Sequence, residues 1–415
     1  MSIRTPADLV VAGGGVIGLA IAWKAAAAGM AVAVVDPTPG QGASWAAAGM
    51  LAPVGEAQFG EEALARLNLT AARAWPDFAR DLEGATGRTV DYQASGTLLV
   101  AVDPSDREAT DDVLGYRLAL GLTARRLTSR ECRDAEPLLA PGIRGGVELP
   151  EDHQVDNRRV VEALLDACRA TTVSFVDDEV TEVTTDASGV TGVALRRGGR
   201  LDSPTVVLAA GCRSGQVGGV PDRLRPPVRP VKGLTVRLLA PDGAPRLARS
   251  VRGLMHGRSC YLVPRPDGTV VVGATVEEKG FDLSVQVGPV VDLLDDARRL
   301  VPALDEYELR ETTTGLRPGS PDNAPIVGST GLDGLLVATG HYRNGILLAP
   351  ITADEVVRLL AAGRPSGRGS PAQATSHGAR RTPEFAAFAA FGPERFDALA
   401  NDRPPPARTG SAVGR

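Results

Sequence analysis

The stretch between residues 8 and 36 constrains the fold of this chain more than any other part of the sequence. It opens with an apolar run at 9–12, whose length and composition are typical of a buried parallel strand. An Ala-rich segment with strong helix propensity follows at 17–28, and a second apolar run at 31–35 ends in Asp36. Strand, helix, strand and terminal acid in this order predict a dinucleotide-binding βαβ unit.

Three glycines at G-x-G-x-x-G spacing join the first predicted strand to the helix. Gly13 allows a tight turn, Gly15 lets backbone N–H groups approach a pyrophosphate, and Gly18 lets the helix pack closely against the strand. The helix N-terminus adds unpaired donors and a partial positive charge that favour phosphate. Asp36 stands where a carboxylate can accept hydrogen bonds from ribose hydroxyls.

Size, charge and cysteine usage narrow the class of protein. A chain of 415 residues exceeds the usual size of one hydrophobic core, so two domains are expected. A net charge of −5 argues against a nucleic-acid-binding or anionic-membrane surface. The four cysteines form no C-x-x-C pair, which disfavours a metal site or a disulfide framework and suits a reducing cytoplasm. No apolar run is long enough to span a bilayer.

The remaining pattern predicts an α/β fold with an antiparallel insertion. Helices are expected at 61–85, 106–120, 156–170 and 292–300, and strands at 95–102, 173–180, 190–195 and 204–210. The middle of the chain is rich in β-formers at 228–239, 258–263 and 269–275, with a hairpin turn at 265–268. An apolar strand at 335–339 leads through a glycine-bearing turn into a helix that runs to residue 360. A parallel nucleotide-binding sheet interrupted by antiparallel hairpins fits these predictions.

Four further segments receive local predictions. Ser44 in the small-residue segment 42–53 is expected to cap the start of a helix. The segment 363–383, rich in Gly, Pro, Ser and Arg, is expected to be a flexible linker. Half of the chain's eight phenylalanines follow it, which favours a helix at 384–400 docked on the body, and 401–415 is expected to be a disordered tail.

Four motifs resemble the D-amino-acid oxidase superfamily of flavoenzymes, and within it the glycine oxidase branch of thiazole (thiamine) biosynthesis. They read GGGVIGLAIAW from residue 13, GASWAAAGMLAP at 42–53, YLVPRPDGTVVVGAT at 261–275, and GLRPGSPDNAPIVG at 315–328 together with GHYRNGILLAP at 340–350. The resemblance implies FAD, a Rossmann-like FAD-binding domain interleaved with an antiparallel-sheet substrate domain, and oxidation of an amine by O2. It places the FAD-binding domain at 1–90, 150–225 and 325–362, and the substrate-binding domain at 91–149 and 226–324.

The resemblance also implies the residues that contact the cofactor. These are Gly13, Gly15, Val16, Ile17, Gly18, Asp36 and Pro37 along the adenosine diphosphate; Ala43, Ser44, Ala48, Gly49 and Met50 along the flavin; Val180 through its backbone to adenine; and His341, Tyr342, Arg343, Asn344, Gly345, Ile346 and Leu347 at the flavin pyrimidine edge. Sarcosine oxidases of one class tether their flavin through a cysteine near the segment that here reads 315–317. No cysteine lies there, so the FAD is expected to be non-covalent.

Tyr261, Arg317 and Arg343 match the family's substrate-positioning residues. A guanidinium grips a carboxylate bidentately, which suits Arg317 to an amino-acid substrate. His341 is expected to be a hydrogen-bonded core residue without a role in proton transfer. Val276 stands where some glycine oxidases carry methionine, so the preferred amine stays open.

The expected partners are a small amine or amino acid and O2, with no nucleic acid and no membrane, and the resemblance implies a homo-oligomer, a tetramer. A D-amino-acid dehydrogenase and a sarcosine-type oxidase remain alternatives on the same fold. A nucleotide-binding protein without turnover and an NAD-dependent dehydrogenase fit fewer of the motifs.

Overall fold

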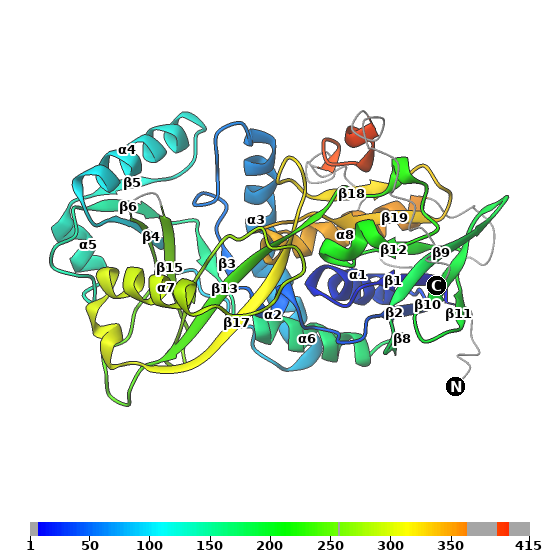
Figure 1. Cartoon of the computed structure of the whole chain (residues 1–415), viewed down its shortest axis with the longest axis horizontal. Helices are drawn as coiled ribbons and strands as arrows, with labels where there is room; N and C mark the ends of the chain where they lie inside the picture. Colours follow the sequence, from blue (N-terminus) through cyan, green and yellow to red (C-terminus); the bar gives the residue numbers. More distant parts are fainter. Residues whose placement is uncertain (1–6, 256–257, 363–387, 398–415) are drawn as a thin grey trace, which may run out of the picture.

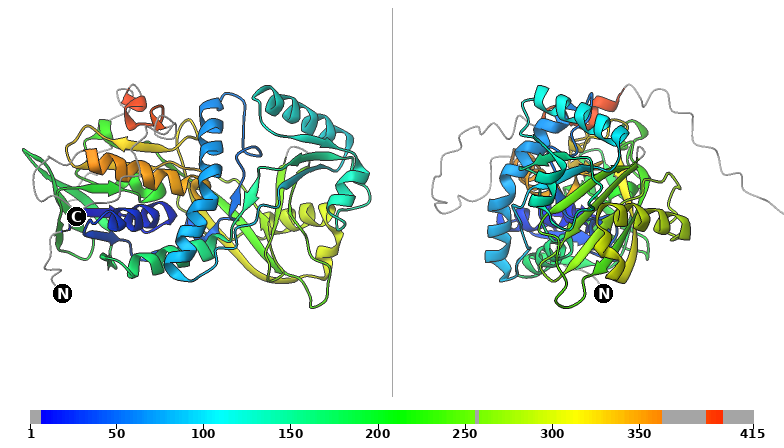
Figure 2. Two further views of the ribbon diagram at one scale, coloured as in Figure 1. Left: turned by 180° about the vertical axis from the view of Figure 1, so that it is seen from behind. Right: turned by 90° about the vertical axis from the view of Figure 1, so that its left-hand side faces the viewer.

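A computed structural model describes residues 7–255, 258–362 and 388–397 of the chain. Its described part is elongated, with one β-sheet near each end and helices packed around both (Figure 1). The long helix α3 (Glu62–Thr86) stands at the junction between the two halves (Figure 2).

The first sheet has six strands and is parallel except at one edge. Its order is β18 (Ile326–Ser329), β19 (Leu335–Thr339), β12 (Val206–Leu208), β1 (Leu9–Ala12), β2 (Val32–Val35) and β8 (Val173–Val176), with β18 antiparallel to β19. In the centre, Val10 pairs with Val206 on one side and Ala33 on the other. Strands joined by long crossovers and buried on both faces require the uninterrupted apolar runs seen in the sequence.

Different elements cover the two faces of this sheet. Leu9 and Val11 point into a core shared with α1 (Val16–Ala27), α3, α6 (Asn157–Arg169) and α8 (Gly345–Ala362). Val10 and Ala12, alternating with them, face a three-stranded antiparallel sheet of β9 (Val180–Asp186), β10 (Gly189–Leu195) and β11 (Arg200–Asp202).

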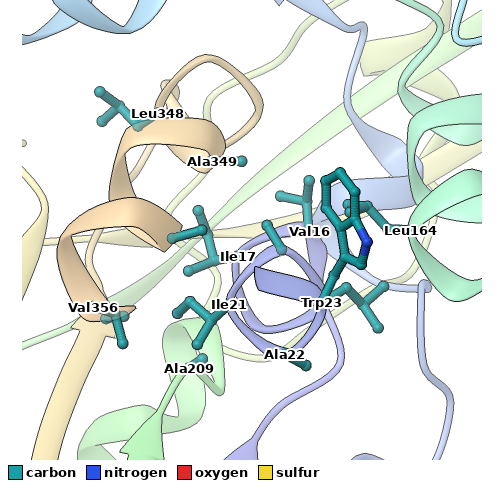
Figure 3. Packing of buried hydrophobic residues seen from close by; sticks show 14 of the residues in the cluster. Val16, Ile17, Ile21, Ala22, Trp23, Leu164, Ala209, Leu348, Ala349 and Val356 are labelled. Atoms are coloured by element: carbon teal, nitrogen blue, oxygen red, sulfur yellow. The ribbon is translucent and has the colours of Figure 1, made fainter. Parts of the chain in front are cut away.

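Helix α1 is buried on nearly all sides, which accounts for a sequence that is apolar at every position except Lys24. Figure 3 shows its side chains Val16, Ile17, Ile21 and Trp23 between Leu164 of α6 and the α8 residues Leu348, Ala349 and Val356.

The second sheet has eight strands and is antiparallel except where β14 runs parallel to β4. Its order is β17 (Glu308–Gly319), β13 (Arg229–Leu239), β16 (Thr269–Gly273), β15 (Arg258–Pro264), β14 (Ser250–Met255), β4 (Thr97–Ala101), β6 (Gly146–Leu149) and β5 (Arg125–Leu127). Helices α4 (Pro104–Ala119), α5 (Ser129–Ala135) and α7 (Val287–Leu300) complete this half. A two-stranded sheet of β3 (Met50–Leu51) and β7 (His153–Gln154) joins the halves.

The predicted fold class is confirmed, because a Rossmann-like parallel sheet and an antiparallel sheet alternate along the chain. The single strand predicted at 173–180 is wrong. It divides into β8 and β9, which belong to different sheets, because Asp178 makes a local turn by accepting from the backbone N–H of Glu179. The predicted domain boundaries remain a proposed division of the chain.

The C-terminal helix predicted at 384–400 is wrong within residues 388–397. That segment forms a 3-10 turn, Pro393–Phe396, because Gly392 is extended and Pro393 interrupts any preceding helix. Docking itself is seen, since Phe388, Phe391 and Phe396 are all buried against the body. The linker at 363–383, the tail at 401–415 and Phe385 lie outside the described residues. Among the described residues, the model contains no helix with the length and apolarity needed to cross a bilayer.

Candidate active site

A cavity of about 730 Å³ lies where the two sheets meet. Its walls include the carboxyl ends of β1, β2, β12 and β19, and residues of β13, β14, β15 and β17 from the second sheet. Ligands of open α/β sheets bind at the carboxyl ends of the strands. The volume is in the range of cofactor and ligand cavities.

Most of the predicted site residues line this one cavity. Those that do are Gly13, Gly15, Val16, Ile17, Asp36, Pro37, Ala43, Ser44, Ala48, Gly49, Met50, Val180, Tyr261, Arg317, His341, Tyr342, Arg343, Asn344, Gly345 and Ile346. Gly18 and Leu347 do not line it. Leu347 is buried, and its carbonyl oxygen accepts from the Trp75 indole N–H at 2.9 Å.

The glycine turn after β1 is held by backbone contacts that leave no room for side chains. Gly13 has φ +112°, and a Cβ there would lie 2.4 Å from the carbonyl oxygen of Ala209. Gly18 sits over the same turn, since a Cβ on it would lie 1.9 Å from the carbonyl oxygen of Gly13. The predicted close approach of helix and strand is therefore seen at Gly18.

Two polar side chains fix the start of α1. The Asp36 carboxylate accepts from the backbone N–H of Gly14 at 2.7 Å and of Thr38 at 2.8 Å. The Ser44 hydroxyl accepts from the backbone N–H of Val16 at 2.9 Å. Ser44 was expected to cap its own helix, and this is wrong. Helix α2 (Ala43–Ala46) begins after Gly42 without a side-chain cap, since Ser44 already lies inside its single turn.

The turn between β19 and α8 is attached to the strand that carries Arg317. The backbone N–H of Tyr342 donates to the carbonyl of Pro318 at 3.0 Å, and Gly319 forms a bridge with His341. These contacts fix Arg317 of β17 relative to Arg343. The N-terminus of α8 opens onto the same part of the cavity, through Gly345 and Ile346.

His341 is buried, and its Nε2 lies 3.1 Å from the Thr352 hydroxyl. Burial lowers the pKa of His341 to about 3. The residue is therefore neutral across the physiological range. That it takes no part in proton transfer stays a prediction.

This depressed pKa makes folding stability depend on pH. At a pH below the ordinary His pKa of about 6.5, His341 binds a proton in the unfolded chain but not in the folded chain. The free energy of unfolding is therefore highest above pH 6.5 and decreases as the pH falls toward 3. Between pH 7 and pH 5 the loss is about 2 kcal/mol. We expect urea unfolding of the FAD-saturated protein to show this extra pH dependence in the wild type and not in His341→Gln. Equal pH slopes would contradict it.

Two glycines of the second sheet form the floor under the predicted substrate residues. The Arg317 guanidinium lies over Gly233 of β13, where a Cβ would be 2.3 Å from Nη1, and Nη1 donates to the carbonyl of Thr275 at 3.1 Å. The Tyr261 ring lies over Gly273 of β16, where a Cβ would be 2.3 Å from the hydroxyl oxygen. Because small residues lie beneath them, both polar ends reach the cavity close to the sheet. Burial raises the pKa of Tyr261, so it remains a hydroxyl donor.

Sequence reasoning missed five charged residues of the cavity wall, Glu56, Glu179, Arg196, Arg213 and Arg252. Two of them, Glu56 and Arg252, are linked to Arg343 by ion pairs. Arg252 Nη2 lies 2.8 Å from Glu56 Oε1, and Arg343 Nη1 lies 3.5 Å from Glu56 Oε2. Glu56 follows the recognised segment 42–53 by three residues, and this proximity was the one sequence signal that could have placed it in the cavity wall. Arg252 is on β14, a strand that was not predicted at all.

A glycine turn at a helix N-terminus, open to a cavity between two sheets, is typical of a dinucleotide-dependent enzyme. The model of the FAD dependent oxidoreductase family (DAO) matches residues 8–359. The chain belongs to this family of FAD-dependent oxidoreductases.

Named relatives cover most of the chain. Glycine oxidase of Geobacillus kaustophilus is 34% identical over 359 residues, covering 85% of this chain and 92% of the relative. The hydrogen cyanide synthase subunit HcnC of Pseudomonas aeruginosa is 31% identical over 389 residues, with coverage of 85% and 92%. The bifunctional protein ThiO/ThiG of Nostoc sp. is 34% identical over 357 residues, and the chain spans 52% of its length.

The fold also agrees with a solved structure. The crystal structure of glycine oxidase from Geobacillus kaustophilus matches with a TM-score of 0.79 and 31% identity, covering 87% of this chain and 96% of that one.

The cavity fits FAD. Its walls run from Val180 and Arg196, through the glycine turn and the small residues Ala43 to Met50, to Tyr261 and Arg317. At the helix N-terminus the backbone N–H groups of Gly15 and Ile17 can donate to phosphate, whereas that of Val16 already donates to Ser44. Ala46, Ala47, Ala48 and Gly49 leave space for a flat ring. We expect the predicted contacts along this path to hold the adenosine diphosphate, and the turn at 341–346 to meet the flavin.

Proposed function

We propose that this chain oxidises glycine and related small amines or D-amino acids, using O2. The products are an imine that hydrolyses to a 2-oxo acid and ammonia, and H2O2. The observation that supports this most strongly is that Tyr261, Arg317 and Arg343 converge on the FAD-sized cavity from three separate elements. Glycine oxidases among the relatives and solved structures also support it.

In this reaction we assign parts to two residues of the pocket, Arg317 and Tyr261. When bound, FAD would accept a hydride from the α-carbon and pass its two electrons to O2, which takes up two protons to give H2O2, while the second proton of the oxidation leaves the amine nitrogen to solvent. Arg317 binds the substrate carboxylate through its planar fork, and the Tyr261 hydroxyl supplies a second donor. This clamp holds the substrate α-carbon in one orientation. Such positioning supplies much of the rate acceleration of the oxidation. An amine that enters unprotonated needs no protein base, in keeping with the buried, neutral His341.

The same proposal gives the reaction a place in metabolism. Oxidation of glycine yields a glycine-derived imine, which we propose is supplied to thiazole formation in thiamine biosynthesis. Relatives named ThiO/ThiG, in which the matching part occupies about half of a bifunctional protein, support this assignment.

A peroxide-coupled assay over glycine, sarcosine and a panel of D-amino acids tests the function. We expect a yellow protein that forms stoichiometric H2O2 from glycine under air. Reduction of a dye without peroxide would point instead to a D-amino-acid dehydrogenase, the alternative on the same fold. Absence of turnover with every compound and both acceptors would overturn the proposal.

The FAD is expected to be released by acid precipitation. Among the described residues, Cys212 is the one cysteine that lines the cavity. Burial raises the pKa of its thiol, which makes it a poor nucleophile for a flavin tether. Flavin absorbance should therefore appear in the supernatant after trichloroacetic acid treatment, and yellow colour retained in the washed pellet would contradict this.

A further inference from the structure

Glu56 is a fixed negative charge in the wall of the cavity, between two arginines. Its side chain is 11% exposed, and its two oxygens face Arg252 and Arg343 at the distances given above. Burial alone would raise the pKa of Glu56, but Arg252 and Arg343 together lower it below the ordinary value, so the carboxylate stays ionised.

The loop that carries Glu56 is held by a second, deeper pair of charged side chains. Asp152 accepts from the backbone N–H groups of Val54 at 2.8 Å and Gly55 at 2.7 Å. Arg117 of α4 donates to the carbonyl oxygens of the same two residues, at 2.7 and 2.9 Å. Four hydrogen bonds on consecutive backbone groups leave Glu56 little freedom to move away from the cavity.

Glu56 also lies close to the predicted carboxylate clamp. Arg252 of β14 pairs directly across from Tyr261 of β15, so the two side chains stand side by side on one face of the sheet. The charges of Arg317, Glu56 and Arg252 all act on the Tyr261 hydroxyl. A substrate held by Arg317 and Tyr261 therefore lies within electrostatic range of the Glu56 carboxylate.

With a monocarboxylate bound at Arg317, Glu56 lowers the excess positive charge of the three arginines in this pocket from two to one. Arg252, Arg317 and Arg343 carry three positive charges, and a monocarboxylate substrate neutralises one of them at Arg317. Glu56 occupies the guanidinium groups of the other two. Among the described residues, Arg252 forms its ion pair with Glu56, and its buried Nη1 has no hydrogen-bond partner.

We propose that Glu56 is a specificity-determining residue, which restricts this pocket to amines with a single carboxylate by occupying Arg252 and Arg343 and repelling a second anionic group. The inference rests on the proposed function, because it takes Arg317 to bind the first carboxylate. Exclusion by a fixed like charge is a common way to build selectivity against a competing ligand.

Equilibrium binding of two unreactive ligands tests this without turnover. Methoxyacetate carries one carboxylate, and diglycolate extends the same ether with a second. By calorimetry on the FAD-bound enzyme at pH 8.5, above the pKa of about 7 to which burial raises Asp152, wild type should prefer methoxyacetate. In Glu56→Gln the preference should shift toward diglycolate by roughly 30-fold. Tighter binding of diglycolate than of methoxyacetate by the wild type would overturn the proposal, whatever the variant does.

Turnover gives an independent comparison with matched controls. The ratio of kcat/KM for iminodiacetate to that for N-ethylglycine should rise by a similar factor in Glu56→Gln. Glu56→Asp, which keeps the charge, should retain most of the wild-type discrimination. Glu61→Gln should leave the ratio unchanged, because the Glu61 carboxylate accepts from Asn323 and does not line the cavity. An unchanged ratio in Glu56→Gln, with glycine still oxidised by the wild type, would refute this inference and leave the proposed function standing.

Discussion

Arg317→Ala is expected to lower kcat/KM for glycine about a thousandfold, chiefly through KM, while FAD remains bound. Two charge-assisted hydrogen bonds to the substrate carboxylate are lost, each worth roughly 2 kcal/mol, and about 4 kcal/mol corresponds to a factor near 10³. The carboxylate is bound before and during the reaction, so the loss falls mainly on binding. Steady-state kinetics with peroxide detection, and the ratio of flavin to protein absorbance, measure both parts.

Arg310→Ala is the matched control for this prediction. Arg310 lies on the same strand, β17, but is exposed, with its guanidinium 3.1 Å from Glu308. We expect wild-type kinetics from it. Arg317→Lys should fall between the two, because a lysine keeps the charge but loses the planar fork. Normal glycine kinetics in Arg317→Ala would rule out the carboxylate role and with it the main support for the proposed function.

The nucleotide-binding half could be predicted because its signals are local. The run from 9 to 12 is apolar at every position since both faces of β1 are buried, and the glycines fall where backbone groups approach within contact distance. Helix α6 was predicted to within one residue at each end, because the Asp156 cap and the apolar stripe can both be recognised from the sequence alone. No partner from elsewhere in the chain is needed to read these features.

The missed parts depend on contacts between distant segments. Strand β14 reads SVRGLM, which lacks alternation, and it is stabilised by parallel pairing with β4 from far earlier in the chain. Helix α7 begins at Val287 rather than at 292, and its N-cap residue Gln286 makes no side-chain cap that could mark the start. Glu56 is placed by Asp152 and Arg117, which no local pattern links to its loop. The wall of the substrate pocket is therefore a tertiary property, whereas its cofactor turn is a local one.

Gly18→Ala is expected to weaken FAD binding at least ~100-fold, corresponding to about 3 kcal/mol of enforced repacking. The new Cβ would lie 1.9 Å from the carbonyl oxygen of Gly13, so α1 must move away from the turn that it packs against. This movement carries the N–H groups of Gly15 and Ile17 away from the phosphate position, although Gly18 itself does not line the cavity. Flavin content after purification, and fluorescence titration of the stripped protein with FAD, measure the loss.

A second glycine-to-alanine change separates this effect from a general loss of stability. Gly84 lies in the exposed last turns of α3, and a Cβ there would meet nothing within 4 Å. Gly84→Ala should therefore bind FAD normally and unfold at the same or a slightly higher temperature, because alanine favours the helix by up to about 1 kcal/mol. Gly18→Ala should keep the far-ultraviolet circular dichroism of a folded α/β protein while losing its flavin. Full FAD affinity in Gly18→Ala would contradict this prediction. It would mean that close packing of α1 on Gly13 does not position the helix for phosphate binding, and that this packing does not explain the glycine spacing.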